Sequence, residues 1–270
     1  MHTIRRVAAA LSATLLAILG MALTSPAAHS SPQTSQVSVL HAVPGATVDV
    51  WANGKPLLTN FKPGTLTEPQ ALPAGSYDIK IVKAGDPATA AAVIEAKGLQ
   101  VPAGANLTLV AHLDAMGKPV LTAFANDTSA SSKGARLTVR HVAAAPAVDV
   151  RAGGKVVVPG LVNPKQAALD LAPGTVSADV VLAGTDTVAI GPADVKLSQG
   201  HNTIVYAWGS AEGKNLALAV QQVTLMGGGL PHTGVADEPT SNVLPIVASA
   251  VMVAFVGALA LRRTRSAVRN

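Results

Sequence analysis

The middle of the chain contains an internal repeat, and this repeat limits the possible folds more than any other feature. Residues 41–55 match residues 141–155 at an offset of 100, and both copies carry a Val-Asp-Val triplet in the same place. Residues 104–110 match residues 200–206 at an offset of 96, because loops differ in length between the copies. Each copy is long enough for one small domain, so the sequence predicts two similar folded units in series.

Repeat 1 is expected to cover residues 36–127 and repeat 2 to cover residues 135–225. Residues 128–134 lie between them and are small or polar, with three serines and a glycine, which is typical of a linker. Because only 3% of the residues are aromatic, the cores must be filled by Val, Leu, Ile and Ala. Each unit is therefore expected to be modestly stable by itself.

Within each copy, apolar and polar residues alternate in short runs bounded by Gly, Pro and Asn, which is typical of half-buried strands. The dipeptides Asn53-Gly54 and Gly153-Gly154 suit two-residue hairpin turns, which need positive φ. In repeat 1 the runs predict strands at residues 37–41, 47–51, 77–82, 91–95, 107–112 and 120–124. In repeat 2 they predict strands at residues 137–141, 148–151, 156–158, 176–182, 188–190, 203–208 and 216–223.

No long stretch between residues 36 and 225 shows the apolar period of a helix. About seven short strands in roughly 90 residues are typical of an immunoglobulin-like sandwich. We therefore expect an all-β fold of two tandem immunoglobulin-like antiparallel β-sandwich domains. Helices are expected only in an N-terminal signal segment and a C-terminal transmembrane segment.

The N-terminus has the pattern of a secretory signal peptide. Arg5 and Arg6 precede an apolar run at residues 7–23, and Pro26 interrupts the run before several small residues. This order predicts a signal peptide over residues 1–30, with cleavage between Ser30 and Ser31. The alternative is an uncleaved anchor helix.

The C-terminus has the pattern of a membrane anchor. Residues 243–261 are almost entirely apolar or small, and at 1.5 Å rise per residue they can cross the hydrocarbon core of a bilayer. Four arginines follow in residues 262–270, which predicts a cytoplasmic basic tail and places the body outside.

A five-residue motif precedes this predicted span within a linker at residues 226–242. The motif is Leu230-Pro231-His232-Thr233-Gly234. Together with the apolar span and the basic tail, it resembles the Leu-Pro-x-Thr-Gly sorting signal of Gram-positive surface proteins. The resemblance implies that a sortase cysteine attacks the carbonyl of Thr233, releases Gly234 and all that follows, and passes Thr233 to an amine of peptidoglycan. The alternative is a membrane-tethered protein in which the motif is coincidental.

The body also resembles a family. The His-Ala-x-Pro opening at residues 41–44, the Val-Asp-Val triplet and the Leu-Pro-Ala-Gly turn at residues 72–75 are similar to the bacterial extracytoplasmic family called domain of unknown function 4397. The resemblance implies an immunoglobulin-like sandwich and frequent attachment to the envelope, but no activity. The copies differ at Trp51, which becomes Arg151, so a pocket lined by that tryptophan would not be duplicated.

Charge and cysteine content exclude several classes. The net charge of +5 comes from the two ends, whereas residues 31–229 carry 14 basic and 13 acidic side chains. A nearly neutral body without a clustered basic face argues against nucleic-acid binding. The chain has no cysteine, which excludes zinc-cysteine, iron–sulfur and disulfide-stapled modules.

The remaining candidates for chemistry are the equivalent pairs His41 with Asp49 and His141 with Asp149. A metal or general-base role would need a further ligand or partner, and neither repeat supplies one at a suitable spacing. The structural interpretation is that the histidine closes a strand and the aspartate points to solvent between two inward valines. The sequence has no Gly-x-Ser-x-Gly elbow and no cysteine nucleophile, so we expect no enzyme, no metal and no cofactor.

These features together predict a secreted surface protein that is covalently linked to peptidoglycan and has a structural or binding role. The expected partners are a sortase, peptidoglycan, the plasma membrane before sorting, and envelope polymers or other surface proteins. The alternatives are an anchored hydrolase that acts on the envelope and a membrane-tethered spacer that no sortase cleaves.

Overall fold

The computed structural model describes residues 33–226, and this part of the chain consists of sixteen strands with no helix. The all-β prediction is confirmed for these residues. No helix that is long and apolar enough to cross a membrane occurs among them. The predicted signal peptide, transmembrane segment and basic tail lie outside the described residues.

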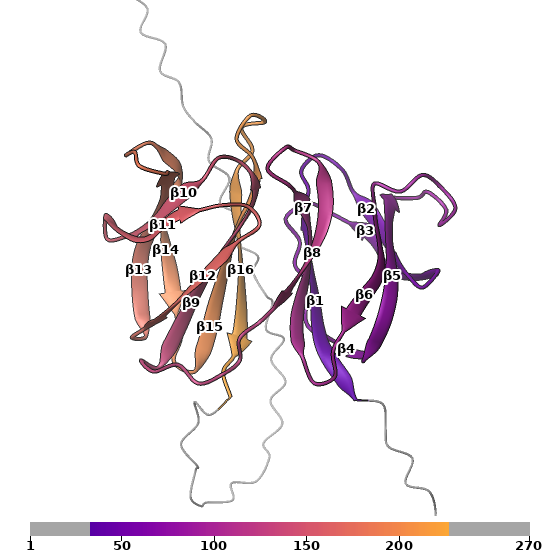
Figure 1. Cartoon of the computed structure of the whole chain (residues 1–270), viewed down its shortest axis with the longest axis horizontal. Coiled ribbons are helices and arrows are strands. Elements are labelled where there is room, and N and C mark those ends of the chain that lie inside the picture. The colour runs from indigo at the N-terminus through magenta and orange to yellow at the C-terminus, as the bar shows by residue number, and fades with distance from the viewer. Residues whose placement is uncertain (1–32, 227–270) are drawn as a thin grey trace, which may run out of the picture. The chain divides into compact units, whose positions relative to one another are not determined.

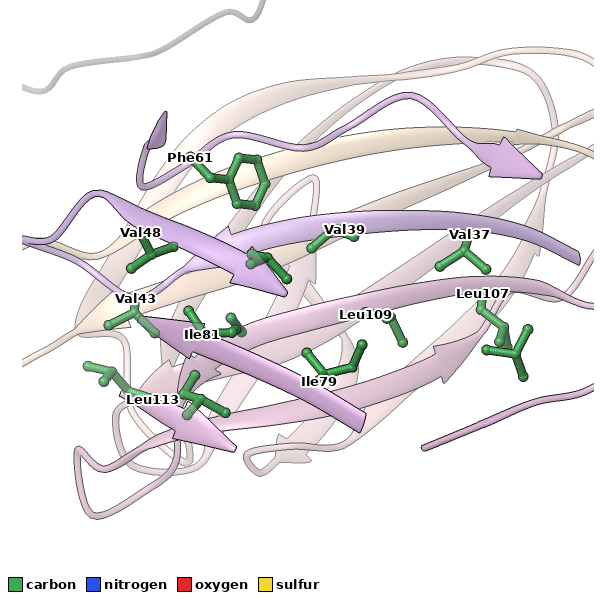
Figure 2. Close-up of a cluster of buried hydrophobic side chains, with 14 residues drawn as sticks. Val37, Val39, Val43, Val48, Phe61, Ile79, Ile81, Leu107, Leu109 and Leu113 are labelled. Atoms are coloured by element: carbon green, nitrogen blue, oxygen red, sulfur yellow. The ribbon is translucent and has the colours of Figure 1, made fainter. Parts of the chain in front are cut away.

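Eight strands form the first sandwich, which has one sheet in the order β4-β1-β7-β8 and another in the order β3-β2-β5-β6. Their bounds are β1 (Thr34–Ala42), β2 (Val48–Ala52), β3 (Lys55–Phe61), β4 (Gln70–Pro73), β5 (Gly75–Lys83), β6 (Ile94–Val101), β7 (Asn106–Leu113) and β8 (Pro119–Ala125). The inward side chains of both sheets form one hydrophobic core, which contains Val37, Val48, Ile79, Ile81 and Leu109 among others (Figure 2).

The second sandwich repeats this arrangement, with sheets in the orders β12-β9-β15-β16 and β11-β10-β13-β14 (Figure 1). Its strands are β9 (Ala135–Ala144), β10 (Val148–Ala152), β11 (Lys155–Leu161), β12 (Gln166–Leu171), β13 (Gly174–Leu182), β14 (Val188–Leu197), β15 (His201–Ser210) and β16 (Ala217–Thr224). Leu137, Val150, Val180 and Leu197 are members of its own core. Every strand of the first sandwich thus has an equivalent in the second.

One pairing in each sandwich differs from the antiparallel expectation. β1 pairs with β7 in parallel, and β9 pairs with β15 in parallel, whereas all other strand pairs are antiparallel. The first strand of each sandwich lies between a short antiparallel neighbour and a long parallel one. Apolar and polar residues alternate in the same way in parallel and in antiparallel strands. The sequence pattern therefore could not predict the parallel pairs.

The sequence also missed β3, β4 and β12, and it placed β6 too early. β3 and β4 are sheet edges that contain Pro56 and Pro73, and proline is tolerated at such edges because part of the backbone there is unpaired. The register between β2 and β3 also shifts at a bulge, which breaks the period of two. β6 contains Gly98 with φ of 66°, beside a register shift against β5.

A third core joins the two sandwiches. It contains Leu40, Ala42, Val110 and Phe124 from the first sandwich and Val142, Ile204, Tyr206 and Val223 from the second. We call the β4-β1-β7-β8 and β12-β9-β15-β16 sheets the facing sheets, because each one contributes its second face to this shared core. β7 and β15 are consequently buried along nearly every residue, as strands covered on both faces must be.

Arg136 binds several residues of the segment that connects the two sandwiches. Its guanidinium pairs with Asp127 at 2.7 Å and with Asp170 at 2.9 Å, and it donates to the carbonyl oxygens of Ser129 and Ala130. Asp170 also accepts hydrogen bonds from the backbone N–H and the hydroxyl of Ser132. The predicted linker at residues 128–134 therefore forms hydrogen bonds with charged side chains of the second sandwich.

Because the sandwiches share a core, we expect them to unfold together. Ile204 is fully buried, and Ile204→Ala should lower the free energy of unfolding by about 2–5 kcal/mol. The chain has two tryptophans, Trp51 on β2 of the first sandwich and Trp208 on β15 beside the shared core, so single-tryptophan variants report on these two places by fluorescence during urea denaturation. Both reporters should give the same midpoint, and Ile204→Ala should shift both.

The matched control is Val220→Ala, because Val220 is 53% exposed and its truncation leaves no cavity. Two separate midpoints, or a shift confined to the Trp208 reporter, would show that the shared core does not couple the sandwiches.

Candidate functional site

The two predicted processing sites lie outside the described residues. They are the sorting motif at Leu230, Pro231, His232, Thr233 and Gly234 and the signal-peptide cleavage site at Ser30 and Ser31. The body does contain the histidine and aspartate pairs, so their geometry can be compared with the predicted chemistry.

His41 and His141 lie in equivalent positions near the ends of β1 and β9, and both rings are buried. Nε2 of His41 lies 2.8 Å from the carbonyl oxygen of Ala46, and Nε2 of His141 lies 3.0 Å from that of Pro146. In each ring Nδ1 accepts a hydrogen bond from the backbone N–H two residues later. A neutral ring protonated at Nε2 satisfies both contacts, and burial lowers the pKa of both histidines, which favours that form. Each histidine thus holds the loop that follows its strand.

The expectation that Asp49 and Asp149 point to solvent is wrong, because both side chains are buried. Asp49 accepts hydrogen bonds from the backbone N–H of Asn60 at 2.7 Å and of Gly85 at 2.9 Å. Asp149 makes the same pair of contacts with the equivalent residues, at 2.7 and 2.9 Å. The carboxylate therefore ties β2 or β10 to the next strand and to a distant hairpin turn, so its role in each sandwich is to connect backbone segments.

The histidines and aspartates are not assembled into a larger centre. Among residues 33–226, no three side chains of the types that ligate metals lie close enough together to hold an ion. His41 instead binds a backbone group of the β1–β2 loop, and Asp49 binds backbone groups of β3 and of the turn after β5. In each sandwich the histidine binds the loop after the first strand, and the aspartate binds the turn after β5 or β13 at the same end.

The sequence analysis missed a polar network in the shared core. Arg140 donates to Gln166 at 2.8 Å, to the hydroxyl of Tyr206 at 2.7 Å and to the carbonyl oxygen of Ala125 in the first sandwich at 3.1 Å. Its guanidinium also lies 4.5 Å from the ring centroid of Phe124 and 5.3 Å from that of Tyr206. Arg140 is 1% exposed, and it forms no ion pair within the described part of the chain.

The network continues through buried hydroxyl and amide groups. The hydroxyl of Tyr206 donates to Oε1 of Gln221 at 2.6 Å, and the same oxygen accepts a hydrogen bond from Thr108 of the first sandwich at 2.9 Å. Burial is the main cause that raises the pKa of Tyr206 and lowers that of Arg140. A phenol with a raised pKa stays neutral, so it remains a donor to Gln221.

Comparison of the two copies could have revealed this network. Arg140 pairs with Tyr206 in the β9–β15 register, and Leu40 pairs with Val110 in the β1–β7 register. Leu40 is therefore the equivalent of Arg140, and Val110 is the equivalent of Tyr206. Two neighbouring apolar residues in one copy are thus replaced by a cation and a phenol in the other. Paired replacement at buried positions is a signal for contact, but it does not show which surface covers them.

The copies also differ at the position of Trp51, which is Arg151 in the second copy. Both side chains lie on the sheet face away from the sandwich core. Arg151 makes a two-point contact with Asp179 at 2.6 and 2.8 Å and pairs with Asp186 at 3.0 Å. The residue that pairs with Trp51 in place of Asp179 is Lys80. Both members of the cross-strand pair have changed together, so the two surfaces have different chemistry.

Two cavities differ between the sandwiches. The first sandwich has an apolar gap of about 10 Å³ between its sheets, beside Leu58, Leu72 and Tyr77, which is at most the space of one water. The second sandwich has an open pocket of about 320 Å³, whose lining includes Leu182, Thr187 and Lys214. Only the second cavity has the size of a small-molecule site.

The fold and these sites define an all-β protein of two sandwiches that share a core, with hydrogen-bonded histidines and aspartates that connect its loops. Residues 35–151 of the chain match the family model described as a domain of unknown function, DUF4397. This match confirms the resemblance for residues 35–151, that is, for the first sandwich and for the segment up to β9 and part of β10. No curated protein matches the chain.

The contacts of Asp149 predict a dependence of stability on pH. The N–H groups of Gly184 and Gly160 lower the pKa of this carboxyl in the folded state. The carboxylate therefore stabilises the fold fully above the unfolded pKa of about 3.9, and the contribution is lost as pH falls through the lower, folded pKa. Asp149→Asn should lower the melting temperature at pH 7, and the difference from the unaltered protein should narrow below pH ~4.

The control is Asp194→Asn, because Asp194 is exposed on β14. Melting curves of the three proteins between pH 7 and pH ~2.5 test this account, since that range covers the titration of a carboxyl. A difference between Asp149→Asn and the unaltered protein that stays constant over the whole range would contradict it.

Proposed function

We propose that this protein is exported and that a sortase joins it to peptidoglycan, where the two sandwiches serve as a structural or binding component of the surface. The observation that carries the proposal is the order of three segments after the body: the motif at residues 230–234, the apolar stretch at residues 243–261 and the arginines that follow. Such a helix and basic tail would hold the motif at the membrane surface until cleavage.

The fold is compatible with this role. β16 ends at Thr224, so only residues 225–229 separate the last strand from Leu230. A connection of this length would keep the sandwiches close to the point of attachment. The interpretation of each sandwich as immunoglobulin-like, and of the second as another copy of the DUF4397 module, belongs to this proposal and is supported by the repeated strand order.

The geometry favours binding or spacing over hydrolysis. An envelope hydrolase needs a pair of acid–base groups or an activated nucleophile in a cleft. Of the residues that line the larger pocket, only Lys214 is ionisable. His41 and Asp49, the strongest candidates in the sequence, are occupied by backbone groups.

Mass spectrometry of wall fragments tests the proposal. A muralytic enzyme should release a peptide of this protein that ends at Thr233 and carries a peptidoglycan remnant. Recovery of the protein from the membrane fraction with Asn270 still present, and no such fragment, would identify a tethered protein without sortase cleavage and would reject the proposal.

A pair of variants gives the matched control. Pro231→Ala should move most of the protein from the wall to the membrane fraction, because proline keeps the motif out of regular secondary structure and in a form that a sortase can bind. His232→Ala should leave wall attachment unchanged, because the third position of a Leu-Pro-x-Thr-Gly signal accepts any residue. Equal wall attachment of both variants would contradict recognition of this motif.

A further inference from the structure

The pocket of the second sandwich lies where three loops meet at one end of its core. Its lining comes from Ala145 in the β9–β10 loop, from Leu182 and Ala189 beside the β13–β14 turn, and from Ala211 and Lys214 in the β15–β16 loop. The volume of about 320 Å³ lies at the lower end of the ~300–1,000 Å³ found for ligand pockets. A ligand of this pocket must therefore be small.

One residue of the pocket lining is smaller than its equivalent in the first copy. In the first sandwich, Val93 packs against the core that contains the buried side chains of Val43 and Leu113. The strand registers place Ala189 at the equivalent position of the second copy, because Val180 pairs with Ile190 where Ile81 pairs with Ile94. A valine that packs against the first core is thus replaced by an alanine on the lining of the pocket in the second sandwich, so side-chain volume is missing there.

The β15–β16 loop is held in one conformation beside this space. The N–H of Ser210 donates to Oδ1 of Asn215 at 2.7 Å, and the hydroxyl of Ser210 accepts from the N–H of Gly213 at 3.1 Å. A Cβ at Gly209 would lie 2.4 Å from the carbonyl oxygen of Asn215, so the loop closes tightly on that glycine. The pocket is therefore bounded by a fixed loop.

Lys214 is the unusual residue of this loop. Its φ is 51°, a left-handed conformation that lysine rarely adopts and that glycine or asparagine would adopt at lower cost. It forms no ion pair with any residue in the described range 33–226. Lys214 is an exposed residue with an unfavourable backbone conformation, and it lies on the lining of an otherwise aliphatic pocket, with the hydroxyl-bearing Thr187 as the other polar side chain.

We propose that this pocket binds the terminal carboxylate of a short alanine-containing peptide, with Lys214 contacting the carboxylate and the alanine and leucine side chains contacting the peptide methyl groups. A charged donor such as an ammonium forms strong hydrogen bonds with a carboxylate, and methyl groups bury well against Ala and Leu. This binding does not depend on the proposed anchoring. Peptides that end in D-alanine, as wall peptides do, and peptides that end in L-alanine, as protein C-termini do, share this chemistry.

The test is isothermal titration of the full chain in mild detergent with N-acetyl-D-alanyl-D-alanine and N-acetyl-L-alanyl-L-alanine, each as the free acid and as the C-terminal amide. At least one free acid should bind, and its amide should bind at least about tenfold more weakly, because the amide lacks the charge that pairs with Lys214. A preference for the D,D or the L,L acid identifies the source of the ligand, and either preference supports the site.

Two variants separate the charge from the cavity. Lys214→Asn removes the ammonium but suits the left-handed backbone, so it should keep the melting temperature and weaken binding by about tenfold or more. Ala189→Val restores the residue of the first copy, fills part of the pocket and should also weaken binding. Lys118→Asn, in the equivalent loop of the first sandwich, is the control and should bind as the unaltered protein does.

Three results would overturn the proposal. They are the absence of binding by both free acids, equal affinity for acid and amide, and unchanged affinity in Lys214→Asn. Loss of sortase cleavage would affect none of these measurements, so this proposal and the proposed function fail separately.

Discussion

The two sandwiches meet around a buried positive charge, Arg140, which has no acidic partner among residues 33–226. The guanidinium of Arg140 is surrounded by neutral groups, namely the rings of Phe124 and Tyr206, a side-chain amide and a backbone carbonyl oxygen. An isolated charge in an apolar core costs several kcal/mol, whereas cation–π contacts contribute about 2 kcal/mol or more when they are desolvated. Because Phe124 and Ala125 belong to the first sandwich, these two contacts, which offset part of the cost of burying the charge, exist only when both sandwiches are docked.

The same dependence extends to the rest of the described chain. The central strands of each facing sheet are buried on both faces, so neither sandwich can expose its second face to water without uncovering Leu40, Val110 or Ile204. Asn163 of the second sandwich adds a polar contact, since its Nδ2 donates to the carbonyl oxygens of Leu113 and Ala143 at 2.8 and 2.6 Å. The expectation of modestly stable units therefore has to be applied to the pair of sandwiches together, which has three cores, one of them shared.

How much the sequence could predict depends on the neighbours of each element. β5 and β13 have one covered and one exposed face, so their alternation predicted them closely. β7 and β15 were also predicted, but nothing in their long apolar runs shows whether a neighbouring sheet or a partner covers the second face. The role of Asp49 was missed for a different reason. Its partners, Asn60 and Gly85, are brought to it by a bulge and a turn that leave no regular pattern in the sequence.

The shared core is built from the same face of both copies, and this has a consequence for symmetry. Leu40 and Val110 on one side correspond to Arg140 and Tyr206 on the other, as the parallel registers show. Two identical sandwiches that associated through this face would place two guanidinium groups in one interface, where they would repel each other. Joining both copies in one polypeptide removes that restriction, since each face can then change by itself. A covalently linked pair can thus contain a one-sided charged contact that a symmetric homodimer of the same module could not accommodate.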